Sequence, residues 1–165
     1  MPGDVCRSFR SESAHETLAL AGALGSLLTG GEVLALAGGL GAGKTTFTKG
    51  LCAGLGLEDS RLVSSPTYVL EHIYEARVPV RHYDAYRLSC EDELLALGFQ
   101  EHLGGRSVLV IEWADKFLSV LPPERLLVEL SIQAGDTAGT RRRIDLSGPR
   151  VLWGERLERI RGTKQ

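Results

Sequence analysis

The spacing of hydrophobic residues predicts three elements in the first third of the chain. Leu18, Ala21, Leu24 and Leu28 recur at helical intervals behind a capping box, Ser13-Ala14-His15-Glu16, so the first predicted element is an amphipathic helix over about 14–28. The apolar run 32–37 predicts a short buried strand, and 45–55 predicts a second helix. A glycine-rich segment connects that strand to that helix.

The middle of the chain predicts shorter elements. Apolar residues alternate on both sides of Pro79 between Ile73 and Tyr83, which predicts two short strands, the second reaching Asp84. Pro79 itself indicates a turn or a sheet edge. Residues 90–97 carry acids in their first turn and are followed by Gly98, which predicts a short helix. The continuous apolar run 107–113 contains Glu112 near its end and is typical of a strand covered on both faces of a parallel sheet.

The C-terminal part predicts antiparallel pairing. Segments 125–133 and 140–146 alternate and are separated by the turn-forming residues 134–139, which indicates a hairpin, and 151–160 predicts a closing helix. The order of elements therefore predicts an α/β fold with a central, mostly parallel sheet, flanking helices and a C-terminal antiparallel hairpin. A length of 165 residues suits one domain, so we expect residues 1–165 to form a single unit.

The segment between the first strand and the second helix carries the clearest chemical signal. It reads Gly-Gly-Leu-Gly-Ala-Gly-Lys-Thr over 38–45 and matches the phosphate-binding P-loop pattern completely. Glycines let backbone N–H groups curl around an anion, Lys44 adds a charge for the β- and γ-phosphates, and the Thr45 hydroxyl can ligate Mg²⁺. The helix that follows contributes its N-terminal dipole. A glycine-rich turn without function is the alternative, and it would require this spacing and context by accident. The predicted nucleotide-binding residues are Gly38, Gly39, Leu40, Gly41, Ala42, Gly43, Lys44, Thr45 and Thr46.

Two carboxylates are candidates for the magnesium-binding acid of a P-loop nucleotidase. Glu112 ends the most apolar strand after the P-loop, where ligands bind in such sheets, and Asp84 ends a shorter strand. The alternative for either is a solvated loop carboxylate. Thr67 lies in Ser65-Pro66-Thr67-Tyr68. Two interpretations are open: its hydroxyl reaches Mg²⁺ or orients water, or the segment is an ordinary entry into a strand. Trp113 either packs in the core or presents its ring to the site.

Composition and charge narrow the function classes. A net charge of −2 gives no bulk attraction for nucleic acid. The three cysteines, Cys6, Cys52 and Cys90, are widely spaced, which favours reduced thiols in a cytoplasmic protein over disulfides or a zinc site. No apolar run approaches the roughly 18 residues that cross a bilayer, so we expect no membrane association.

Other polar residues carry weaker signals. Arg141, Arg142 and Arg143 fall on a predicted strand, where a charged solvent face is favoured over a phosphate or RNA contact. His15, His72, His82 and His102 have no metal-ligand spacing, and we assign them no role. The chain lacks the Asn-Lys-x-Asp segment typical of guanine recognition near 114–117, which favours adenine.

Four segments together resemble the bacterial TsaE (YjeE) ATPase family. They are residues 38–50, Ser65-Pro66-Thr67-Tyr68, His82-Tyr83-Asp84-Ala85-Tyr86-Arg87-Leu88 and Ile111-Glu112-Trp113, and the resemblance covers roughly 12–133. It implies a P-loop ATPase domain that uses ATP and Mg²⁺. It also implies action with the TsaB and TsaD proteins in the threonylcarbamoyl modification of adenosine 37 in tRNAs that read codons beginning with A, with tRNA reached only through the complex.

The resemblance also implies roles for individual residues. Lys44 would bind the phosphates, Thr45 and Glu112 would hold Mg²⁺ with Asp84 beside them, and Trp113 would form a wall of the site. The catalytic set is then Lys44, Thr67, Asp84 and Glu112. Gly39 and Ala85 differ from the commoner family residues, but neither change affects the phosphate-cradling glycines or Lys44.

Two other function classes remain open. A small-molecule P-loop kinase needs an acceptor pocket and an arginine-bearing lid, for which Arg87 and Arg141–Arg143 are the candidates. A nucleotide-dependent binding module that does not hydrolyse nucleotide is the second.

Overall fold

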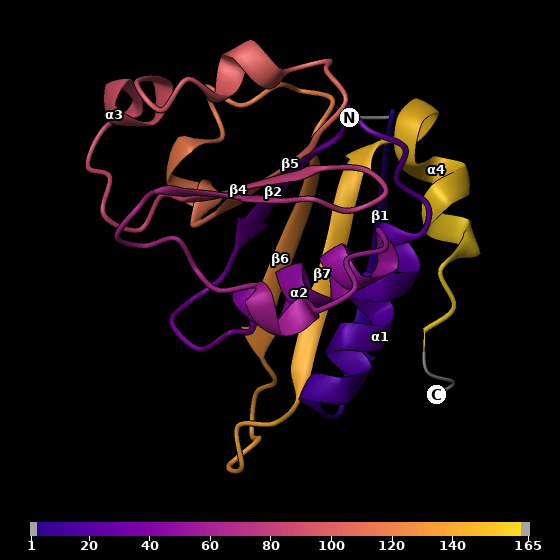
Figure 1. The fold of residues 1–165 in the computed structure, drawn as a ribbon. Helices are drawn as coiled ribbons and strands as arrows, with labels where there is room; N and C mark the ends of the chain where they lie inside the picture. The colour runs from indigo at the N-terminus through magenta and orange to yellow at the C-terminus, as the bar shows by residue number, and fades with distance from the viewer. Residues whose placement is uncertain (1–2, 163–165) are drawn as a thin grey trace.

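The protein, described by a computed structural model over residues 3–162, is built on one seven-stranded sheet (Figure 1). The strands are β1 (Asp4–Ser11), β2 (Val33–Ala37), β3 (Glu71–Tyr74), β4 (Val80–Asp84), β5 (Val108–Glu112), β6 (Leu126–Ile132) and β7 (Arg142–Pro149). Their order is β1-β7-β6-β2-β5-β4-β3. Strands β6, β2, β5 and β4 are parallel to one another, whereas β7, β1 and β3 pair antiparallel. The predicted α/β fold with its mostly parallel centre and C-terminal hairpin is confirmed.

In the described part of the chain, four α-helices pack against the sheet. They are α1 (Ala14–Gly25), α2 (Lys44–Gly54), α3 (Glu91–Leu95) and α4 (Arg150–Arg159), with 3₁₀ turns at Ser60–Leu62, Phe99–His102 and Ala114–Phe117. Helix α1 stops three residues before the predicted end, because the chain after Gly25 closes in tighter turns that still bury Leu28. None of the helices within 3–162 is long and apolar enough to cross a membrane.

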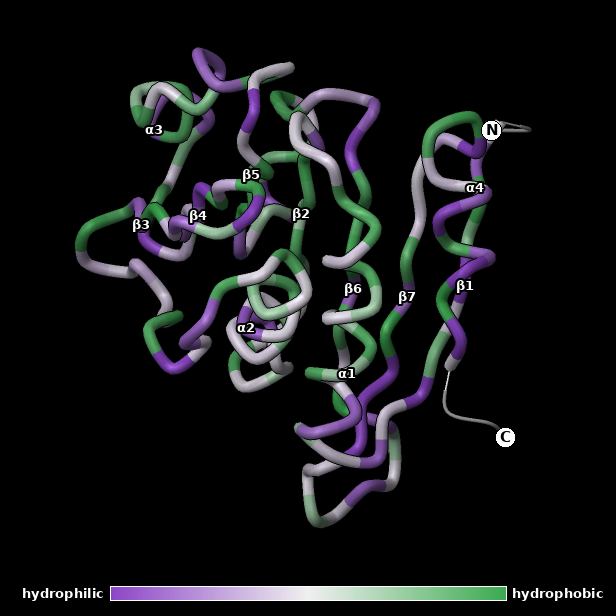
Figure 2. Tube along the Cα trace, turned by 45° about the vertical axis from the view of Figure 1, so that its right-hand side comes forward, coloured by the Kyte–Doolittle hydropathy of each residue, from purple (hydrophilic) through white to green (hydrophobic). Residues whose placement is uncertain are grey.

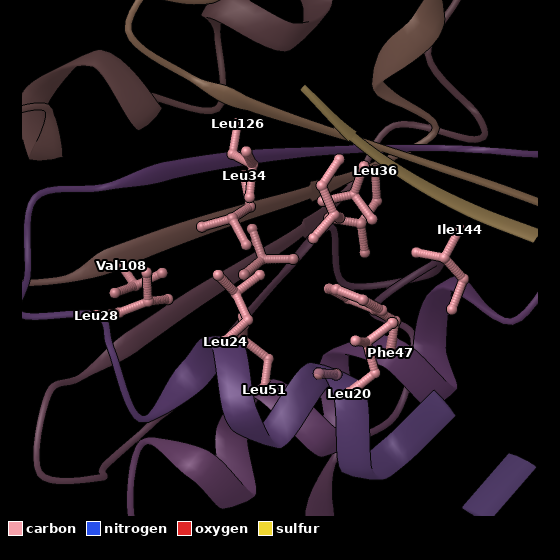
Figure 3. Packing of buried hydrophobic residues seen from close by; sticks show 14 of the residues in the cluster. Leu20, Leu24, Leu28, Leu34, Leu36, Phe47, Leu51, Val108, Leu126 and Ile144 are labelled. Atoms are coloured by element: carbon pink, nitrogen blue, oxygen red, sulfur yellow. The ribbon is translucent and has the colours of Figure 1, made fainter. Parts of the chain in front are cut away.

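Side-chain alternation along the strands divides the core into two clusters. Leu34 and Leu36 of β2 face α1 and α2, whereas Val33 and Ala35 face α3 and the two later 3₁₀ turns. Figure 3 shows Leu24 of α1 and Leu51, Phe47 of α2 directed at the strand residues of the first cluster. On β4 and β5 the same alternation places His82, Asp84 and Glu112 on the α2 side of the sheet.

Strand β1 was not predicted from the sequence. Its inward positions are Val5, Arg7, Phe9 and Ser11, so apolar residues recur only at every fourth position and the strand alternates weakly (Figure 2). The two polar inward residues are accommodated by specific partners. Arg7 donates to the backbone carbonyls of Leu157 and Ile160, and the Ser11 hydroxyl lies 2.8 Å from that of Thr17.

Helices α1 and α2 approach each other closely through glycines. A Cβ atom added at Gly50 would lie 2.4 Å from the Leu18 carbonyl oxygen, and one at Gly54 would lie 2.1 Å from that of Gly22. Since both distances are far below van der Waals contact, only glycine fits at these two positions. The backbones of the two helices therefore touch directly, and α2 is held in place by α1.

We expect Gly50→Ala to destabilise the protein by about 1–3 kcal/mol, because the added methyl group overpacks this contact. Gly22→Ala is the matched control, since its Cβ would meet the Gly50 carbonyl oxygen at an ordinary 3.5 Å and alanine favours the helix. Urea unfolding of both variants measures the difference. Equal stability of Gly50→Ala and Gly22→Ala would contradict the close packing.

Candidate nucleotide-binding site

The P-loop joins β2 to α2 in a conformation that requires glycine. Gly38 has φ 149° and Gly43 has φ 104°, and a Cβ atom at Gly38 would lie 2.4 Å from the Leu130 carbonyl oxygen. The N-cap of α2 is Gly43, a residue with no side chain to cap the helix. The N–H groups of the first turn are therefore free of a side-chain cap, as in an anion site at a helix N-terminus.

Lys44 occupies the neck of this loop. The residue as a whole is 5% exposed. Its ammonium group donates to the carbonyls of Gly38 at 2.6 Å and Gly39 at 2.8 Å and lies 3.7 Å from the centre of the Trp113 ring. Burial lowers the pKa of Lys44, and the carboxylates of Glu112, Asp115 and Asp84 oppose that shift. The ammonium has thus already lost most of its water, which strengthens its attraction for phosphate.

Glu112 and Asp84 lie side by side at the ends of β5 and β4, where they are register partners. Both carboxylates are buried. Thr45 donates to the two Glu112 oxygens at 3.1 and 3.3 Å, so these two residues, both predicted to hold Mg²⁺, lie in contact. The structure thereby places both candidate acids beside the first turn of α2.

Asp84 is tied to the segment that contains Thr67. Its Oδ2 accepts hydrogen bonds from the hydroxyls of Ser65 and Thr67, the latter at 2.8 Å, and its Oδ1 accepts one from the Tyr86 backbone N–H at 2.8 Å. Residues 63–70 form no strand; they make a turn that ends at Leu70, a non-glycine residue with φ 70°. The segment leads directly into β3, which begins at Glu71, and its Ser65 and Thr67 hydroxyls bond to the Asp84 carboxylate.

These groups surround one pocket of about 420 Å³. Trp113 forms part of its wall in a left-handed backbone conformation, φ 59°, with its ring 4.9 Å from that of Tyr86. A second pocket of about 330 Å³ adjoins it and shares Gly43, Thr46 and Arg142. The residues that line the first pocket are Leu40, Gly41, Gly43, Lys44, Thr45, Thr46, Ser65, Thr67, Asp84, Tyr86, Glu112, Trp113 and Arg142.

Three predicted nucleotide-binding residues do not line that pocket. Gly38 and Gly39 direct their carbonyls at Lys44, and Ala42 is buried with its carbonyl bonded to Arg142. Within residues 3–162 no cluster of three or more His, Cys, Asp or Glu side chains suited to a metal is found.

The sequence did not predict a site role for Ser65, Tyr86 and Arg142, which line the pocket, or for His82, which contacts Glu112. For Arg142 the sequence favours a charged solvent face over a phosphate or RNA contact, whereas in the structure its guanidinium donates to the P-loop carbonyls of Ala42 at 2.9 Å and Gly41 at 3.0 Å. Alternation on a strand directs the middle arginine of three away from its neighbours, and that signal could have identified it. His82, to which no role was assigned, is fully buried with Nε2 2.8 Å from Glu112.

Comparison with known proteins identifies the family. The profile of the family described as "Threonylcarbamoyl adenosine biosynthesis protein TsaE" matches residues 11–144. The chain belongs to the TsaE family. TsaE proteins take part in tRNA threonylcarbamoyladenosine biosynthesis, and the resemblance inferred from the four sequence segments is confirmed.

Individual relatives agree with this assignment. The TsaE protein of Treponema pallidum is 39% identical over 124 residues, which cover 75% of this chain and 90% of that protein. The TsaE protein of Bacillus subtilis is 41% identical over 129 residues and 78% of each chain. Among solved structures, YdiB of Bacillus subtilis superposes with a TM-score of 0.76 at 29% identity and covers 95% of both chains.

Proposed function

We propose that this TsaE protein binds and hydrolyses ATP with Mg²⁺ as an accessory subunit, acting with TsaB and TsaD in the threonylcarbamoylation of adenosine 37 of tRNA. The observation that carries the proposal is the convergence of Lys44, Thr45, Glu112 and Asp84 on one pocket at the N-terminus of α2. A buried cation at the phosphate position and two carboxylates beside it are the groups that phosphoryl transfer requires.

The donor set around Thr45 fits Mg²⁺ rather than a metal with an all-protein cage. Magnesium in nucleotide sites takes one or two protein oxygens and completes its octahedron with phosphate and water. Thr45 Oγ1 and Glu112 Oε1, 3.1 Å apart, belong to the two residues that would supply the protein oxygens, and Asp84 lies beside Glu112 on the adjacent strand. When bound, Mg²⁺ would offset the negative charge of the β- and γ-phosphates. Asp84 and Thr67, which are hydrogen-bonded to each other, would hold water in the same pocket.

The adjoining pocket has a place for the nucleoside. It continues past Thr46 and Arg142 toward Ser13 and Ala14 at the start of α1, and it shares its boundary with the phosphate pocket. ATP would then extend from Lys44 across the first turn of α2 into this second space. The two volumes of about 420 and 330 Å³ together suit a ligand of nucleotide size.

The rim of the phosphate pocket favours contact with partner proteins. Leu40 and Tyr68 are 85% and 83% exposed, and Val69 and Tyr86 are exposed beside them. Apolar and aromatic side chains exposed around one site are typical of a protein interface. Because Tyr68 and Val69 follow Thr67 directly, ordering of that turn by nucleotide would change the surface offered to TsaB and TsaD.

The affinity for the TsaB–TsaD complex is therefore expected to differ between the ADP state and a non-hydrolysable ATP analogue. Thr67→Val should narrow this difference several-fold while leaving nucleotide affinity nearly unchanged, because valine keeps the shape but loses the 2.8 Å hydrogen bond to Asp84. Calorimetric titration of the complex in each nucleotide state measures the effect. Equal affinities in both states, or an undiminished difference in Thr67→Val, would remove the switch role of this segment.

Two assays separate the alternative functions. The kinase alternative needs mobile arginines over the pocket, but Arg87 stacks on the Tyr68 ring at 4.2 Å and Arg142 bonds to the P-loop. A phosphotransfer assay against nucleosides and small metabolites tests it directly. Release of phosphate by the protein alone, and with TsaB and TsaD, separates an ATPase from a binding module without hydrolysis.

A further inference from the structure

A buried hydrogen-bond chain leads from the Ser64 backbone to Glu112. Tyr74 of β3 donates its hydroxyl proton to the Ser64 carbonyl at 3.0 Å, and the same hydroxyl lies 3.3 Å from His82 Nδ1. His82 Nε2 lies 2.8 Å from Glu112 Oε1. None of these contacts belongs to the P-loop, and His82 lines no part of the phosphate pocket.

The chemistry of the partners fixes the proton on the histidine ring. An ionised carboxylate only accepts hydrogen bonds, so the 2.8 Å contact to Glu112 requires a proton on Nε2. Nδ1, on the other side of the ring, faces the Tyr74 hydroxyl at a longer distance of 3.3 Å. The ring is 0% exposed, so no bulk water competes for either nitrogen.

The arrangement treats the two oxygens of Glu112 differently. Oε1 accepts from His82 at 2.8 Å and from Thr45 at 3.1 Å and lies 3.5 Å from the Thr48 hydroxyl, whereas Oε2 has a single contact, 3.3 Å, with Thr45. His82 lies on β4, the strand next to Glu112, and on the same face of the sheet. Its ring can therefore hold Oε1 by a hydrogen bond between the two strands. Oε2 is the oxygen left for a cation.

We propose that His82 is a positioning residue for magnesium: it orients the Glu112 carboxylate so that Oε2 is presented to the metal. This inference rests on the proposed Mg²⁺–nucleotide site and adds a residue to it. Groups that orient a ligating carboxylate without touching the metal commonly affect metal affinity by about 10–100-fold. His82 acts in this way on Mg²⁺ and leaves the contacts of the nucleotide with Lys44 unchanged.

A matched pair of substitutions isolates this role. The glutamine amide of His82→Gln reaches the position of Nε2 and can still donate to Glu112. The shorter amide of His82→Asn reaches only the position of Nδ1, next to Tyr74. Both variants bury a neutral amide in place of the ring, so a purely structural effect lowers stability in both, which thermal unfolding measures.

The readout is the Mg²⁺ concentration that gives half of the metal-dependent change in binding of a non-hydrolysable ATP analogue, measured by calorimetry, with EDTA as the metal-free reference. In EDTA both variants should bind the analogue as the wild type does. With Mg²⁺, His82→Asn should require about 10–100-fold more metal, whereas His82→Gln should stay within a few-fold of wild type. Wild-type behaviour of His82→Asn would overturn the proposal, and equal loss in both variants would reduce His82 to a structural residue.

A measurement on the ring itself covers the case in which the variants fail to fold. In ¹⁵N-resolved spectra of protein whose other three histidines are replaced by glutamine, the Nε2 atom of His82 should carry a proton. An unprotonated Nε2 would overturn the proposal. If the wild type does not bind the analogue at all, the proposed function fails instead, so the two failures are distinguishable.

Discussion

Lys44→Ala is expected to weaken ATP binding by roughly 100-fold, or about 3 kcal/mol, because the pocket loses its buried cation and charge-assisted hydrogen bonds to phosphate contribute about 1.5–3 kcal/mol each. The scaffold should remain folded, since α2 is anchored by Phe47, Leu51 and the glycine contacts with α1 rather than by Lys44. Equilibrium titration with a fluorescent ATP analogue measures the loss.

Lys49→Ala is the matched control for that experiment. It removes the same charge from the same helix, but Lys49 does not line the phosphate pocket. A comparable loss of affinity in both variants would indicate a general effect of net charge, and wild-type affinity in Lys44→Ala would refute the P-loop assignment.

The second large effect is expected for Glu112→Gln, which should retain metal-free nucleotide binding and lose Mg²⁺-dependent hydrolysis by about 100-fold or more. Glutamine keeps the shape of the side chain and can still accept from Thr45, but it lacks the negative charge that a divalent cation needs. Phosphate release at saturating ATP, in the presence of TsaB and TsaD, measures the rate.

Two further variants serve as a control for this result and as a test of the neighbouring acid. Glu155→Gln makes the same chemical change on exposed α4 and should leave hydrolysis unchanged. Asp84→Asn tests the neighbouring carboxylate. If hydrolysis survived in Glu112→Gln and vanished in Asp84→Asn, Asp84 rather than Glu112 would be the principal magnesium-binding acid.

The sequence was sufficient for the parts of the fold and site that depend on local pattern. The P-loop between β2 and α2 could be predicted because its glycines, Lys44 and Thr45 are contiguous, so one local pattern specifies both the loop conformation and its phosphate-binding groups. The position of Glu112 followed from one continuous apolar run, which predicts a buried central strand. Glu112 lies at the carboxyl end of that strand, where ligands bind in parallel sheets. The α/β arrangement followed from the order of such segments.

What the sequence did not show depends on contacts between distant segments. Arg142 reaches Ala42 across 100 positions, and His82 meets Glu112 across 30, so neither pairing leaves a local pattern. For His82 one signal was available. It precedes Asp84 by two residues on the same strand and must share its face.

The weakly alternating strand β1 was missed for a related reason. Its inward Arg7 and Ser11 are tolerated only because their hydrogen-bond partners come from α4 and α1. Local propensity cannot anticipate a buried polar group whose partners lie elsewhere in the chain.

The glycine contact between α1 and α2 limits which parts of this molecule can move relative to the pocket. Because the Gly54 position leaves no room for even a methyl group against Gly22, α2 cannot tilt toward α1, and tilting away would open the contact along its length. Helix α2, which carries Thr45, is thus held in a fixed position. In the proposed function, displacement caused by a change at the nucleotide phosphates would therefore be expected on the side of the pocket lined by Ser65 and Thr67, in residues 63–70, where Tyr68 and Val69 are exposed.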